Sequence, residues 1–164
     1  MILIALGGNL ESPLWGPPRA TLEAALQALQ SEGIRLLLRS RFYLCAPVPP
    51  SDQPYFVNAV AALDTPLAAA PLLVRLLALE TRLGRTRGAR NAARILDLDL
   101  LDHDGAVIQT PFLELPHPRL EKRRFVLLPL AEIAPFWRHP LSGLSALELL
   151  ALLPPGESVE PLPE

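Results

Sequence analysis

The sequence has few cysteines and no long apolar run near its start. Cys45 is the single cysteine among 164 residues, so no disulfide can form within the chain and a disulfide-stapled secreted module is excluded. The apolar run at residues 1–6 is too short for a signal peptide, and it is far shorter than the roughly 20 residues that cross a membrane. We therefore expect a cytoplasmic protein that does not associate with membranes.

The chain also lacks an excess of positive charge. Its formal net charge is -2 at pH 7, which argues against a surface built to bind nucleic acid. A length of 164 residues with 50% hydrophobic positions suits one domain spanning residues 1–164, for which no oligomer is required.

Charge is nevertheless segregated within one part of the chain. Residues 82–94 carry arginines and no acid, and a group of aspartates follows directly. The arginines are Arg82, Arg85, Arg87, Arg90 and Arg94, and the aspartates are Asp97, Asp99, Asp102 and Asp104. We expect a cationic loop to lie beside an acidic strand.

Hydrophobic periodicity predicts strands and helices over the first two thirds of the chain. The predicted strands cover residues 2–6, 34–44, 56–63 and 95–101. The predicted helices run from Pro17-Pro18 to a stop at Gly33 and from Pro71 to a cap at Gly84, with leucines at helical spacing between these ends. Gly7-Gly8-Asn9 is expected to form a turn after the first strand, because glycine permits unusual dihedral angles.

The order strand, helix, strand, strand, helix, strand predicts an α+β fold. It is typical of a ferredoxin-like βαββαβ core, an antiparallel sheet with helices packed on one face. The second and third strands should be neighbours joined by a proline-rich loop. After Asp102 we expect a C-terminal helical appendage, with a turn at Asp104-Gly105 and a final helix at residues 145–153. A capping box of Ser145 and Glu148 would begin that helix, and the tail after residue 154 is expected to fray.

Asp97 and Asp99 are two residues apart on a predicted strand, so both carboxylates should project from one face. That spacing allows them to hold one hard cation or a pair of Mg²⁺ ions, with a nucleotide polyphosphate supplying further oxygen ligands. A solvated strand face is the alternative, although aspartate is depleted in strands. Both interpretations remain open on spacing alone.

The arginines before this strand are suited to binding phosphate oxygens, because guanidinium groups are planar and permanently charged. The alternative is that they complement the carboxyl end of the preceding helix, above all Arg82. Neither a Walker A loop nor a Rossmann fingerprint occurs in the chain, so any nucleotide must be held in another way.

Four further residues have both a binding and a structural interpretation. Phe56 and Asn58 share one face of a strand and suit a flat polar heterocycle, but an aromatic residue on a strand is more often part of the core. His117 lies between two prolines, where it could meet a phosphate or stay exposed. Phe125 could stack on a ring or anchor the core, and Cys45 is interpreted as a small buried filler.

Several motifs occur in a fixed order along the chain. They are Ala5-Leu6-Gly7-Gly8-Asn9-Leu10, Asp52-Gln53-Pro54 through Phe56-Val57-Asn58-Ala59, Arg94-Ile95-Leu96-Asp97-Leu98-Asp99-Leu100, Leu115-Pro116-His117-Pro118 and Arg123-Arg124-Phe125-Val126-Leu127. Together they resemble the 6-hydroxymethyl-7,8-dihydropterin pyrophosphokinase family of folate biosynthesis over nearly the whole chain.

The resemblance implies transfer of pyrophosphate from ATP to the hydroxymethyl group of the pterin, giving AMP and the pterin diphosphate. It implies two Mg²⁺ ions on Asp97 and Asp99, with ATP and the pterin as the small-molecule partners. The residues implied to bind ATP are Glu80, Arg85, Arg87, Arg94 and His117. Those implied to bind the pterin are Cys45, Ala46, Val48, Phe56, Asn58, Arg123 and Phe125, with Phe56 and Phe125 on either side of the ring. Catalysis would involve Asp97, Asp99, Arg85 and Arg94.

Two other functions remain open: a magnesium-dependent phosphotransferase or phosphohydrolase with a different acceptor, and a ferredoxin-like binding module without turnover. Asn91-Ala92-Ala93 stands where the family usually has Trp-Gly-Pro, Cys45-Ala46 stands for Thr-Pro, and Glu11-Ser12 stands for Gly-Asp. Residues 46–54 and 84–93 flank the site, so we expect both segments to become ordered when substrates bind.

Overall fold

A computed structural model describes residues 1–164 and has an α+β fold built on an antiparallel sheet. The sheet places β5 (Asp97–His103), β1 (Ile2–Gly8), β4 (Phe56–Asp64), β3 (Tyr43–Cys45) and β8 (Val159–Pro161) side by side in that order. A further strand, β2 (Arg35–Arg39), also pairs with β4. Every pairing in the sheet is antiparallel, and the predicted neighbours β3 and β4 are joined by the proline-rich loop.

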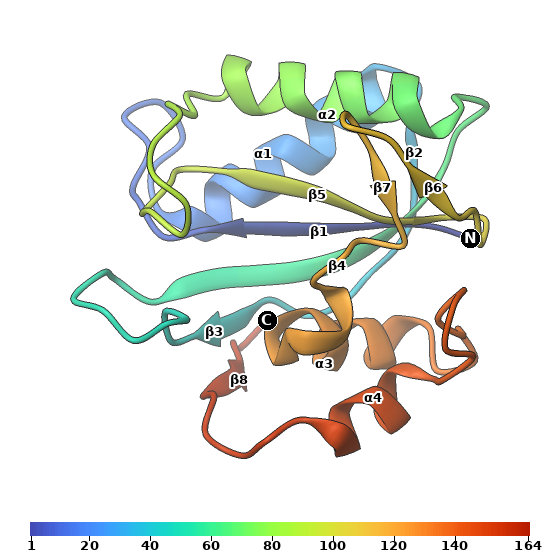
Figure 1. Cartoon of the computed structure of the whole chain (residues 1–164). Helices are drawn as coiled ribbons and strands as arrows, with labels where there is room; N and C mark the ends of the chain where they lie inside the picture. Colours follow the sequence, from blue (N-terminus) through green and yellow to red (C-terminus); the bar gives the residue numbers. More distant parts are fainter.

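Helices cover both faces of this sheet (Figure 1). On one face lie α1 (Pro18–Ser31) and α2 (Ala69–Arg82), and on the other lie α3 (Arg124–Ile133) and α4 (Ala146–Leu152). Two apolar clusters result, one beneath each pair of helices. The prediction of helices on one face is therefore correct for α1 and α2, whereas the C-terminal helices cover the opposite face. None of the helices is long and apolar enough to cross a membrane.

Short elements connect β5 to α3. The strands β6 (Ile108–Gln109) and β7 (Glu114–Leu115) form a two-stranded ribbon, and the 3₁₀ turn η1 (Leu120–Lys122) leads into α3. Farther on, Ser145 and Glu148 form the predicted capping box at the start of α4.

The two central helices follow from leucine spacing and their end signals. In α1, Leu22, Leu26 and Leu29 are buried, and in α2 the buried leucines recur in the same way. Helix α2 begins at Ala69, two residues before Pro71, because a proline in the first turn needs no amide partner. Gly84 follows α2 with φ +100°, a conformation that favours glycine.

The single strand predicted at residues 34–44 is wrong, because the segment forms two strands, β2 and β3. The pairing with β4 shifts between Leu36 and Leu38, and Leu38 is 50% exposed although an unbroken alternation from Ile34 would place it in the core. Between the two strands the buried Ser40 donates a backbone hydrogen bond from its amide to the Val60 carbonyl, and its hydroxyl accepts a hydrogen bond from the Val60 amide. A bulge of this kind shifts the period-two pattern to the other face.

Two further predictions about the backbone are wrong. Gly7 and Gly8 do not form a turn, since they are the extended end of β1. A Cβ on Gly7 would lie 2.3 Å from Asn58 Oδ1, and a Cβ on Gly8 would lie 2.3 Å from the Ile95 carbonyl oxygen. Glycine is required here by close approach and not by unusual dihedral angles. The tail after residue 154 does not end in frayed chain, since it forms β8 against β3.

The face that carries α3 and α4 is only partly covered by them. At its open end, Asp97 pairs with Gly7 and Asp99 pairs with Ala5 across β1 and β5. Asn58 on β4 pairs with the other side of Gly7. The sheet therefore places two carboxylates and an amide on one surface, above strand residues with little or no side chain.

Candidate active site

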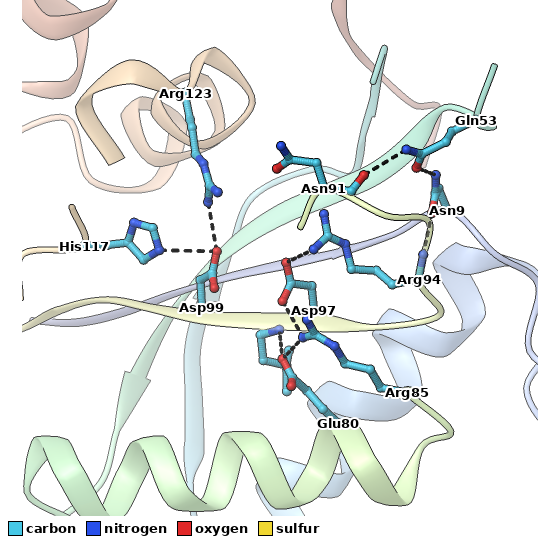
Figure 2. A network of polar contacts seen from close by, with 11 residues as sticks. Asn9, Gln53, Glu80, Arg85, Asn91, Arg94, Asp97, Asp99, His117 and Arg123 are labelled. Atoms are coloured by element: carbon cyan, nitrogen blue, oxygen red, sulfur yellow. Dashed lines mark hydrogen bonds and ion pairs between the residues drawn. The ribbon is translucent and has the colours of Figure 1, made fainter. Parts of the chain in front are cut away.

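Asp97 and Asp99 project together from β5, as the alternation predicts (Figure 2). Their side chains are 24% and 27% exposed, whereas Leu98 between them is buried in the core. The pair is therefore accessible from solvent and rigidly spaced by the strand.

Basic side chains from three separate segments surround these two carboxylates. Asp97 accepts a hydrogen bond of 2.6 Å from Arg85 and lies 3.3 Å from Arg94. Asp99 accepts a hydrogen bond of 3.0 Å from Arg123, and the ring of His117 lies 3.6 Å away. The predicted arginine loop thus lies beside the acidic strand, and α3 and the Pro-His-Pro segment add two groups from farther along the chain.

Glu80 is a buried acid beneath this cluster. It lies on α2, where it accepts hydrogen bonds from the Leu98 amide at 2.6 Å and from Arg85 at 2.7 Å. Burial raises its pKa to about 7, although the Leu98 amide and Arg85 oppose the shift. Glu80 fixes both Arg85 and the strand between the two aspartates.

His117 is held in one tautomer by its backbone surroundings. Its Nδ1 accepts a hydrogen bond from the Arg119 amide, and its own amide donates to the Leu101 carbonyl at the edge of β5. Burial lowers the pKa of His117, with Asp99 opposing this. The neutral ring therefore carries its proton on Nε2, on the side that faces Asp99.

A cavity of about 280 Å³ opens on one side of the acidic pair, and we call it the first cavity. Phe56 from β4 and Phe125 from α3 both line it, each with an arginine guanidinium 5.4 Å from its ring centroid. The other sequence-predicted residues in its wall are Cys45, Ala46, Val48, Asn58, Arg94, Arg123, Asp97 and Asp99.

Cys45 is a buried residue in the wall of the first cavity. Burial raises the pKa of its thiol to about 12, so the thiol stays protonated. This agrees with its interpretation as a filler and gives it no nucleophilic role.

A second cavity of about 350 Å³ lies on the other side of the same two carboxylates. Glu80, Arg85 and His117 line it together, and their predicted contact with ATP stays a prediction. Its remaining walls come from α2, β5, the β6–β7 ribbon with its turn, and the Pro-His-Pro segment: Leu73, Leu77, Leu98, Leu100, Thr110, Pro111, Phe112, Leu113, Glu114 and Pro118. Asp97 and Asp99 border both cavities, so the acidic pair lies where the two meet.

Hydrogen bonds join the loops that flank the site. Asn9 donates to the Gln53 side chain at 3.1 Å, and its carbonyl oxygen Oδ1 accepts from the Arg94 amide at 2.9 Å. Gln53 in turn donates to the Asn91 carbonyl at 2.8 Å. The proline-rich and arginine-rich loops are thus connected through the residue that follows β1.

One residue that the sequence predicted for the site lies outside both cavities, and several residues that it did not predict line the first cavity. Arg87 is exposed and lines neither cavity, so its predicted contact with ATP stays a prediction. Arg119 and Lys122 line the first cavity, and the run of charges at residues 119–124 is the signal that could have identified them. Glu157 also lines this cavity, but nothing in its local sequence indicates this.

The donor set of the acidic pair suits Mg²⁺. No group of three or more His, Cys, Asp or Glu side chains forms a closed metal site in the structure. Mg²⁺ usually takes only one or two carboxylates and completes its shell with water and substrate phosphates, which the adjoining cavities leave room for. Gly7 and Ala5 beside the two aspartates leave space above the strand.

An acidic pair among arginines, between two cavities, is typical of an enzyme that transfers phosphoryl groups with the help of divalent cations. The sequence model of the 7,8-dihydro-6-hydroxymethylpterin-pyrophosphokinase family matches residues 3–135. The chain belongs to this family.

Three relatives illustrate the similarity, and each is named 2-amino-4-hydroxy-6-hydroxymethyldihydropteridine pyrophosphokinase. The protein from Pseudomonas aeruginosa is 44% identical over 99% of this chain and 96% of its own length. That from Haemophilus influenzae is 42% identical over 80% of this chain and 79% of its own length. That from Methylorubrum extorquens is 39% identical over 93% of this chain and 92% of its own length.

Proposed function

We propose that this chain transfers the pyrophosphoryl group of ATP to the hydroxymethyl group of 6-hydroxymethyl-7,8-dihydropterin, in folate biosynthesis. A bond forms between the hydroxyl oxygen and the β-phosphorus, and the bond between the β-phosphorus and the oxygen of the α-phosphate breaks. AMP leaves and the hydroxyl proton is lost to solvent. The observation that carries the proposal is the position of Asp97 and Asp99, which border two cavities at once.

The pterin is proposed to bind in the first cavity. Phe56 and Phe125 approach it from the sheet and from α3, an arrangement that supports stacking on both faces of a flat ring. Asn58 supplies a donor and an acceptor for the polar ring atoms. The backbone of Cys45, Ala46 and Val48 forms the adjoining wall, where carbonyl and amide groups can contact the ring edge.

ATP is proposed to bind in the second cavity with its phosphates over the acidic pair. Arg85 and His117 line that cavity, and Arg94 and Arg123 reach the same two carboxylates from the first cavity. The three arginines neutralise Asp97 and Asp99 in the structure. When ATP binds, they are free to turn toward phosphate oxygens, because a guanidinium pairs as well with phosphate as with carboxylate.

Asp97 and Asp99 are the residues that would hold Mg²⁺, and we propose two ions. When bound, these ions neutralise phosphate charge and favour ionisation of the substrate hydroxyl. No side chain of the site is an evident general base: His117 directs a proton toward Asp99 and does not offer a lone pair there. Catalysis therefore depends on placing the hydroxyl in line with the β-phosphorus and on neutralising charge.

We further infer that the core is a ferredoxin-like βαββαβ unit and that residues 1–164 act as one domain. The antiparallel order β5-β1-β4-β3, with α1 and α2 on one face, supports this topology. The loops at residues 46–54 and 84–93 are proposed to order further on substrate binding. Their connection through Gln53 and Asn91 supports a joint movement.

Product analysis tests the proposed function. The chain, incubated with ATP, Mg²⁺ and 6-hydroxymethyl-7,8-dihydropterin, should release AMP and the pterin diphosphate in equal amounts. Formation of ADP or inorganic phosphate, with the pterin unchanged or singly phosphorylated, would identify a different transferase or a hydrolase.

A further inference from the structure

Glu157 brings a carboxylate into the first cavity from the C-terminal tail. It lines this cavity together with Cys45, Pro47 and Phe56, although it lies far from them in the sequence. Its Oε2 atom is shielded from solvent and has no hydrogen-bond partner. A shielded carboxylate oxygen without a donor is costly, so such an atom indicates a partner that the protein itself does not provide.

The backbone of the tail is fixed where this carboxylate enters the cavity. The Ala46 amide donates to the Ser158 carbonyl at 3.1 Å, and Val159 pairs with Cys45 in β8 and β3. The charge of Glu157 also contributes, after burial, to the raised pKa of the Cys45 thiol, which agrees with a short separation between the two side chains. Glu157 is therefore held against the wall formed by residues 45–48.

Cations of the chain do not satisfy Glu157. The first cavity contains Arg94, Arg119, Lys122 and Arg123, yet Glu157 takes part in none of the ion pairs of the structure. Arg94 and Arg123 pair instead with Asp97 and Asp99. The cavity thus has carboxylates of two kinds: a pair that the protein neutralises and a single one that it leaves free.

The sheet separates these two kinds of carboxylate. Asp97 and Asp99 lie on β5, whereas Glu157 lies two residues before the start of β8, which is four strands away across the sheet (Figure 1). At a spacing of about 4.8 Å per strand the two backbones are roughly 19 Å apart. Side chains that reach inward from both edges leave a gap suited to a two-ring heterocycle lying across β1 and β4.

We propose that Glu157 determines specificity for the amino-pyrimidine end of the substrate, by accepting hydrogen bonds from the 2-amino group and the adjacent ring N–H. This rests on the proposed function. The two N–H groups lie side by side and point the same way, so a carboxylate can accept both, as it does from a guanidinium. The hydroxymethyl group lies at the opposite end of the pteridine, so binding at Glu157 directs it toward Asp97 and Asp99.

The test compares Glu157→Gln with Glu160→Gln, a matched change on the exposed strand β8. Glutamine keeps the shape but loses the charge and one acceptor, and a bond to a charged group that is lost weakens binding about 10- to 100-fold. We expect Glu157→Gln to raise the KM and the Kd for the pterin by this factor, with the KM for ATP unchanged and the melting temperature not lowered. Glu160→Gln should match the wild type in all four quantities.

An analogue with hydrogen in place of the 2-amino group separates recognition from a structural role. It should bind the wild type about 10-fold or more weakly than the pterin, while Glu157→Gln should show a much smaller difference between the two ligands. An unchanged pterin Kd in Glu157→Gln, or an equal loss for both ligands, would overturn the inference while leaving AMP formation by the wild type intact. If the wild type neither binds the pterin nor releases AMP, the proposed function fails, and the inference fails with it.

Discussion

Replacing Asp97 by asparagine should abolish most activity without unfolding the protein. No third acidic side chain, histidine or cysteine joins the two aspartates in a metal-binding group. The substitution therefore removes half of the anionic protein ligands available to Mg²⁺. A metal site of this type stabilises transition-state charge by several kcal/mol. A loss of about 4 kcal/mol corresponds to a decrease of about 10³-fold in kcat/KM.

The effect on stability should be much smaller. Asparagine retains an oxygen that can accept the hydrogen bond from Arg85, and the carboxylate of Asp97 is partly exposed to solvent. Removing its charge also relieves repulsion with Glu80 and Asp99. We expect the free energy of unfolding to change by no more than about 1 kcal/mol.

Release of AMP can be followed in a coupled assay at several Mg²⁺ concentrations, with urea unfolding measured in parallel. Asp64→Asn is the control, because Asp64 ends β4 in an exposed ion pair with Arg35, outside both cavities. Activity of Asp97→Asn within tenfold of the wild type at saturating Mg²⁺ would refute the argument. So would a loss of activity that merely follows a large loss of stability.

Three further predictions concern buried groups of the protein. The folded-state pKa of Glu80 is about 7 and its ordinary value is 4.5, so between these pH values the folded state holds a proton that the unfolded chain has released. The contribution of Glu80 to the free energy of unfolding should therefore fall by up to about 3 kcal/mol between pH 4.5 and 7 and then level off. Urea titrations of Glu80→Gln at several pH values should lack this slope. The Cys45 thiol, buried and with a pKa of about 12, should react with a thiol reagent at pH 8 only after denaturant is added; rapid reaction in the folded protein would show that the wall of the first cavity opens. Trp137→Phe should lower the free energy of unfolding by about 1–3 kcal/mol, since the buried Asp102 would lose the donor that now lies 2.7 Å away; calorimetry showing no change would mean that another group replaces it.

Local sequence alone determined the helices α1 and α2 and the direction of the side chains along β5, because these depend only on residues close together in the chain. Alternation along β5 places Asp97 and Asp99 on one face because successive side chains of a strand point in opposite directions. Leucine spacing and terminal glycines determined α1 and α2 in the same way. The ordered motifs went further, since they predicted the family whose model matches residues 3–135, whereas the binding roles they imply for Phe56, Asn58, His117 and Phe125 stay predictions.

Tertiary structure alone decided what depends on distant pairings. The break between β2 and β3 arises from a register shift against β4, and β8 exists because β3 offers it a free edge. No local pattern could indicate that the tail would carry Glu157 into the first cavity, because that position follows from strand order across the whole sheet. The same holds for the meeting of two cavities at the acidic pair, which requires α2, α3 and the β6–β7 ribbon to pack around one end of β5.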